Sequence, residues 1–240
     1  MQSVPPTPGI RYRHEEDAEG VVGSVFRDVR TRMAFVPAIF KVLAGDPEAL
    51  LPAWLQARAL YDHSGAKEAS ARLQRAARPR LPYGPSEAVR EATAPFAEEL
   101  PAMLLIVTSL GLALDGVLPL QPRPPADLPE PGPVPPPEVP DRGEHPLFDE
   151  IRAVYGTEHV PSMFRSLAAR GLLEEPWQAI GPFLAGGRGL ALVGEVEAAA
   201  EEEALRFPEV ACFDAESARP VLDQFRRALP KNLVFATACS

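Results

Sequence analysis

Acidic side chains next to apolar segments are the groups in this sequence best suited to act as a general base. A carboxylate removed from water has a raised pKa and takes a proton from water near neutral pH. Asp115 ends an uncharged run over residues 100–114 and is our candidate base, although such a carboxylate is ordinarily a solvated helix end or loop residue. The carboxylates of this kind are Asp62, Asp115, Glu158 and Asp214.

His159 and Ser162 lie on either side of a Val-Pro pair and carry other reactive groups. An imidazole has an unperturbed pKa of about 6.5, so His159 is either a base or an ordinary loop residue. Ser162 has no recognisable His-Asp partner, which argues against a nucleophilic serine. Cys212 and Cys239 form no C-x-x-C motif, so the sequence indicates no metal site, no disulfide framework and no cofactor.

One short segment occurs twice and organises the chain. Residues 36–44 and 160–168 each contain Val-Pro, an aromatic residue three positions after the proline, a basic residue and Leu-Ala. Trp54 and Trp177 follow the two copies. Proline is favoured at the start of a helix, so each copy predicts a helix that begins near its proline.

The two predicted helix starts form a candidate binding site for a small acid. Backbone N–H groups at a helix start lack partners within the helix and attract anions such as a carboxylate or halide. Aromatic residues at matched positions either line such a cleft or form the core that a duplicated unit requires. The predicted substrate-binding residues are Ala38, Ile39, Phe40, Ser162, Met163 and Phe164.

A second repeated pattern supports a duplicated half-domain. The pattern Phe-x3-Leu-Pro-x2-Leu-x3-Thr occurs over residues 96–108 and again over 225–237. Residues 119–146 contain twelve prolines, which exclude helix and give an extended linker able to cross the molecule. The predicted organisation, with a pseudo-twofold between the repeats, is a flexible arm (1–20), a first helical repeat (21–118), a proline-rich linker (119–146) and a second helical repeat (147–240).

Hydrophobic spacing predicts an all-α fold, because no alternating run of β-branched residues is bounded by hairpin turns. Ser86 is expected to cap a helix, and Pro95 is expected to interrupt or end that helix. The glycine-rich segment 186–189 predicts a turn between helices. It does not predict a phosphate loop, since no strand precedes it and no Lys-Ser/Thr follows it.

Composition limits the class of partner. The chain is 46% hydrophobic and 24% charged, as is typical of soluble globular proteins, and its net charge of −9 argues against nucleic-acid binding. The run over 100–114 is shorter than the roughly 20 residues needed to cross a bilayer, and the N-terminus lacks a signal-peptide pattern. We expect a cytoplasmic protein that binds a small acid, with no membrane partner and a homodimer as one possible assembly.

The repeated segments, the two tryptophans and the linker together resemble the group I (DehI-type) 2-haloacid dehalogenases over most of residues 21–240. The half-unit is also similar to the AhpD-like helical superfamily, whose Cys and His pairs are absent here. The resemblance implies a site between two helical repeats, an Asp that activates water and an Asn from the other half. The implied reaction displaces halide from C2 of a 2-halocarboxylate with inversion.

This sequence departs from the dehalogenase pattern at the catalytic position. The family's Asp corresponds to Met163, and the matching position in the first copy is Ile39. Asn232 is the only Asn, and it lies in the second repeat. Two hypotheses follow: a dehalogenase whose carboxylate lies elsewhere in the sequence, or a non-dehalogenating homologue that binds a small carboxylic acid or a protein partner.

Overall fold

The computed structural model describes residues 12–130, 132–134, 144–157 and 159–240, and all regular structure in these ranges is helical, which confirms the predicted all-α class. Three short 3-10 helices accompany the α-helices: η1 (Glu15–Asp17), η2 (Pro208–Val210) and η3 (Glu216–Ala218). The α-helices are α1 (Gly20–Arg30), α2 (Ala38–Leu43), α3 (Pro47–Tyr61), α4 (Ala66–Ala76), α5 (Glu87–Leu114), α6 (Phe148–Tyr155), α7 (Ser162–Ala169), α8 (Glu174–Ala185), α9 (Gly187–Ala204) and α10 (Arg219–Ala238).

Helix α5 corrects the prediction that Pro95 would interrupt or end it. The helix continues through both Pro95 and Pro101, and Ser86 caps its start as predicted. A proline removes the hydrogen bond to the carbonyl four residues earlier. For Pro101 that carbonyl belongs to Ala97, which accepts a hydrogen bond from Nε2 of Gln74 in α4 at 3.2 Å. A tertiary contact therefore replaces the missing backbone bond.

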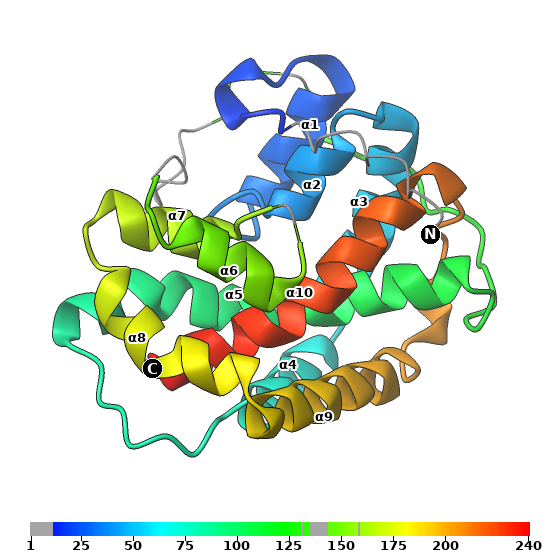
Figure 1. Cartoon of the computed structure of the whole chain (residues 1–240). Helices are drawn as coiled ribbons and strands as arrows, with labels where there is room; N and C mark the ends of the chain where they lie inside the picture. The colour runs from blue at the N-terminus through cyan, green and yellow to red at the C-terminus, as the bar shows by residue number, and fades with distance from the viewer. Residues whose placement is uncertain (1–11, 131, 135–143, 158) are drawn as a thin grey trace, which may run out of the picture.

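The long helices α5 and α10 cross at the centre of the molecule and pack extensively against each other (Figure 1). By length and composition α5 could cross a membrane, but 83% of its most apolar window is buried inside the protein. Its apolar character is that of a core helix.

Some helix pairs follow the predicted duplication, in which α1–α5 correspond to α6–α10, and others do not: α9 packs extensively on α5, with no comparable packing of α4 on α10. Helix α1 packs on α3 as α6 packs on α8, and α4 packs on α5 as α9 packs on α10. Between the two sets, α5 contacts α7 while α10 contacts α2. The starts of α2 and α7 are therefore brought to the central crossing.

The described part of the predicted linker contains no helix and lies along the surface of the other elements. The N–H of Gln121 donates to the carbonyl of Ala211 at 2.6 Å. Arg58 of α3 and Arg27 of α1 donate to linker carbonyls further along. Residues 121–130 thus run along the body after the end of α5, and residues 131 and 135–143 of the predicted linker lie outside the described residues.

Residues 12–19, which belong to the predicted arm, pack against the body in this structure. Glu15 is only 2% exposed, and its Oε1 lies 3.1 Å from Nζ of the buried Lys41. The N–H of Arg13 also donates to the carbonyl of Lys41 at 3.0 Å. This segment therefore covers α2 on the side of the molecule where the two helix starts lie.

Candidate active site

A cavity of about 60 Å³ lies between the starts of α2 and α7 and the crossing helices α5 and α10. Matched positions of the two repeated patterns face it together, so it lies between the two predicted repeats. The matched pairs are Pro37 with Pro161, Ala38 with Ser162, Ile39 with Met163, Phe96 with Phe225 and Leu100 with Leu229.

Both helix starts have nearly the same backbone geometry. Pro37 and Pro161 are the N-cap residues, with φ and ψ of −58° and 145° in one and −55° and 145° in the other. The first N–H groups bonded back to these prolines are those of Phe40 and Phe164, each at 3.0 Å. The two N–H groups before each of them have no acceptor among the described residues, as expected at a helix start.

Phe40 and Phe164, predicted to bind substrate, do not line the cavity. Both are fully buried and pack edge-on against the tryptophan of the same repeat. The ring centroids of Phe40 and Trp54 are 5.3 Å apart, and those of Phe164 and Trp177 are 5.6 Å apart. The structure therefore favours the core interpretation, because the third residue of each helix points into the interior of its own half.

Glu99 of α5 is a carboxylate in the wall of the cavity, and the sequence reasoning missed it. The residue is 7% exposed, and Oε1 accepts a hydrogen bond from the N–H of Ala34 at 3.4 Å. Burial raises the pKa of Glu99 above its ordinary value, an effect that the Ala34 bond opposes and the charge of Glu98 reinforces. Glu99 lies three residues after Phe96 and four before Met103, and this position on an apolar helix face was the available signal.

Asn232 of α10 lines the cavity from the other half of the chain. It is 6% exposed, and its Oδ1 has no hydrogen-bond partner among the described residues. A buried amide oxygen without a donor is costly, so this atom is suited to a ligand or water. In the repeated pattern, Asn232 corresponds to Met103 and Glu99 corresponds to Ala228. Each of the two polar residues therefore faces the cavity from a position that is apolar in the other half.

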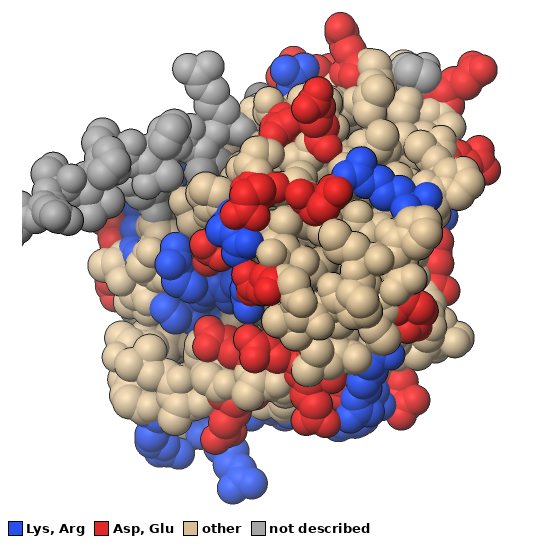
Figure 2. All heavy atoms as spheres, turned by 90° about the vertical axis from the view of Figure 1, so that its right-hand side faces the viewer, with Lys and Arg blue, Asp and Glu red and all other residues tan. Residues whose placement is uncertain are grey.

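The carboxylates proposed from the sequence are in other places. Asp115, at the C-terminal end of α5, accepts hydrogen bonds from Arg219 at 2.6 Å and Arg226 at 3.0 Å. These arginines, with Arg219 first, lower the pKa of Asp115, so it is a poor base, and it does not line the cavity. On this side of the molecule basic side chains lie beside acidic ones (Figure 2). Asp62 pairs with Arg32, Asp214 pairs with Arg123, and Glu158 lies outside the described residues.

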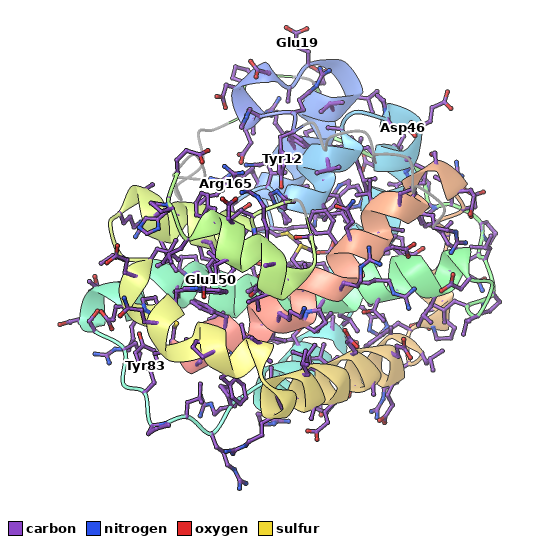
Figure 3. All side chains as sticks on the ribbon, in the orientation of Figure 1. Tyr12, Glu19, Asp46, Tyr83, Glu150 and Arg165 are labelled. Carbon is purple, nitrogen blue, oxygen red and sulfur yellow. The ribbon has the colours of Figure 1, made fainter. Side chains whose placement is uncertain are left out.

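His159 and Ser162 both line the cavity. Burial lowers the pKa of His159 to about 3, with further lowering by the charges of Arg165 and Arg152, so the ring is neutral near pH 7 and a weak base. The hydroxyl of Tyr12 lies 2.8 Å from Nδ1 of this ring. The labels of Tyr12 and Arg165 of α7 lie close together in Figure 3, and the contact of Tyr12 with His159 brings the N-terminal segment to a residue of the cavity wall.

Within the described ranges no three His, Cys, Asp or Glu side chains are grouped to hold a metal ion. Cys212 and Cys239 are buried free thiols.

No protein-family model matches the sequence, and no curated protein matches it. Solved structures do match. A D-2-haloacid dehalogenase in complex with L-LA aligns with a TM-score of 0.72 and 16% identity over 100% of this chain and 98% of that chain. A mutant D-2-haloacid dehalogenase in complex with D-2-CPA aligns with a TM-score of 0.71 and 16% identity over 96% of this chain and 94% of that chain. The aligned region includes both halves and the crossing helices, so this chain has the all-helical fold of the D-2-haloacid dehalogenases.

Proposed function

We propose that this protein is a hydrolase that displaces halide from C2 of a short 2-halocarboxylic acid, with Glu99 as the general base. The observation that carries the proposal is a buried carboxylate with a raised pKa in the wall of a small apolar cavity. A base of this kind is effective near neutral pH because it is a stronger proton acceptor than an ordinary carboxylate. The fold shared with the D-2-haloacid dehalogenases supports the assignment of the reaction class.

The substrate carboxylate is assigned to the start of α7. The N–H groups of Ser162 and Met163 are unpaired there, and the eight-residue helix directs a positive dipole end toward the cavity. Asn232 supplies a second, independent indication of a polar ligand, because its side-chain oxygen has no partner. We assign this amide to holding the attacking water, which donates a hydrogen bond to the unpaired oxygen.

The reaction is a substitution at one carbon atom. The water oxygen forms a bond to C2, the C2–halogen bond breaks with its electron pair on the halide, and Glu99 takes the proton. The products are a 2-hydroxy acid with inverted configuration at C2, a halide ion and, once Glu99 returns its proton to solvent, one proton.

The cavity volume selects short acids. A cavity of about 150 Å³ accommodates benzene. The present cavity, at about 60 Å³, suits an acid of two or three carbons unless its walls move. The apolar residues that line it, including Met163 and Ile39, match the halogen and alkyl portions of such a substrate.

A second candidate function is binding of a small carboxylic acid without dehalogenation. The observation that favours it is Met163, which occupies the position that the family resemblance gives to the catalytic Asp. The carboxylate site at the start of α7 does not require Glu99, so binding can persist where chemistry is lost. In both cases we propose a cytoplasmic protein acting on a small acid.

The test is halide release by the purified protein from chloroacetate and from each enantiomer of 2-chloropropionate, together with calorimetric titration of L-lactate and D-lactate. Halide release with inverted 2-hydroxy acid as product is expected. Binding without halide release would select the second function. Absence of both would contradict the assignment of this cavity to small acids.

A further inference from the structure

A second hollow lies on the other side of Glu99. A groove of about 750 Å³ runs between α4 and α5, and Glu99 borders both this groove and the inner cavity. No other described residue borders both of them. On helix α5 the groove-facing positions, such as Ala102 and Ile106, are rotated away from the cavity-facing positions, such as Phe96 and Met103, and Glu99 lies at the boundary.

The two hollows differ in chemical character. The cavity is lined mainly by apolar side chains, whereas the groove carries Lys67, Arg90 and Glu98, which are exposed. The hydroxyl of Tyr61 also borders the groove and donates to the carbonyl of Arg32 at 2.9 Å. These exposed charged side chains make the groove a favourable environment for water and small ions, and Glu99 is among the residues that line it.

On the side of the cavity where His159 lies, three aromatic rings are in contact. Tyr12 packs on the ring of His159 with centroids 4.9 Å apart, and this ring in turn faces Phe225 at 6.4 Å. Tyr12 of the N-terminal segment thus lies against His159, which is part of the cavity wall. Glu99 is thus the described side chain that the walls of the two hollows share.

We propose that the α4–α5 groove is the access route by which water and short carboxylic acids reach the cavity, with the Glu99 side chain as the gate between them. The route supplies what a buried general base requires, since the proton taken up must return to solvent after each turnover. This inference goes beyond the proposed reaction and does not depend on it, because passage of a small solute is measured without any substrate.

The test uses a thiol at the gate. In the full chain carrying Glu99→Cys, a small negatively charged methanethiosulfonate should modify Cys at position 99, with the unmodified chain reporting the background from the two buried native cysteines. Ser70 lines the groove from α4, whereas Ala76 on the same helix is exposed and lies outside it. Adding Ser70→Trp should slow modification at least about tenfold, and adding Ala76→Trp should leave the rate within about twofold, because thiol reactivity depends on access.

A second thiol, Met103→Cys, keeps the proposal testable if the first variant folds poorly, because Met103 faces only the cavity. Its modification should show the same dependence on Ser70→Trp. An unreactive thiol at both positions, or equal rates with Ser70→Trp and Ala76→Trp, would overturn the proposal. Acceleration by Tyr12→Ala with no effect of Ser70→Trp would also overturn it and place the access route at the N-terminal segment. Failure to release halide would leave these results unaffected, so the two proposals fail separately.

Discussion

Replacing Glu99 by Gln should strongly reduce catalysis and at the same time stabilise the fold near neutral pH. Glutamine has nearly the same shape, and its oxygen can still accept the 3.4 Å hydrogen bond from Ala34. The substitution removes the negative charge, and with it the ability of the side chain to take up a proton. General base catalysis contributes roughly 10²–10⁴-fold, so halide release should fall by about that factor.

The stability change follows from the direction of the pKa shift. Burial raises the pKa of Glu99 above 4.5, so the folded state holds the proton more tightly than the unfolded state. The stabilisation that this proton contributes is fully present below the pKa of the unfolded state. It is lost as the pH rises through the pKa of the folded state. At neutral pH the ionised carboxylate therefore destabilises the fold, and the uncharged amide does not.

The magnitude is modest because water in the α4–α5 groove screens part of the charge. Each unit of pKa elevation corresponds to about 1.4 kcal/mol, and screening reduces the net effect, so we expect a gain on the order of 1 kcal/mol. For a chain of this size that corresponds to roughly 2–4 °C in the melting temperature. The gain should disappear at about pH 4, where both variants are uncharged at this position.

The assay compares halide release and urea unfolding of the Glu99→Gln variant with those of Glu91→Gln, which alters an exposed carboxylate on the same helix. The control should keep its activity and its stability. Full activity of Glu99→Gln would refute the role of Glu99 as base. A loss of stability at pH 7 would refute the inference that its charge is held at an unfavourable site.

Three further outcomes follow from the structure. Asp28 is 7% exposed and accepts a 2.8 Å hydrogen bond from a buried tryptophan, so Asp28→Ala should lower the free energy of unfolding in urea by about 2–4 kcal/mol. The control Glu150→Ala, at the exposed matching position of the second half, should change it by less than about 0.5 kcal/mol. A Cβ at Gly189 would lie 2.0 Å from a backbone oxygen, so Gly189→Ala should destabilise the fold by about 3 kcal/mol or more. A Cβ at Gly187 would lie in open space, so Gly187→Ala should be neutral or stabilising by up to about 1 kcal/mol. Equal melting temperatures of the two variants would contradict this packing. Because the pKa of His159 is lowered in the folded state, the unfolded state binds a proton that the folded state does not. The free energy of unfolding should therefore fall from about pH 6.5 toward pH 3, by up to about 1.4 kcal/mol per pH unit. Unfolding of His159→Gln measured across that range should lack this part of the slope.

The sequence by itself determined the helical class and the two helix starts. Pro37 and Pro161 begin helices because proline fixes φ and lacks the N–H that a helix start leaves unpaired, which is a property of the residue and its immediate neighbours. The same local reasoning failed at Pro95, where it predicted an interruption. Packing in the centre of the molecule holds that helix continuous, and local preference does not include packing.

Only the tertiary structure decided which carboxylate faces the cavity. Asp115 follows an apolar run in the sequence, yet two arginines of α10, distant along the chain, pair with it at the surface. Glu99 lies in the middle of a helix, and its environment depends on how α5 crosses α10 and approaches α7. Burial and charge pairing arise from contacts between residues far apart in the sequence, so the pKa that makes Glu99 a candidate base is a property of the fold.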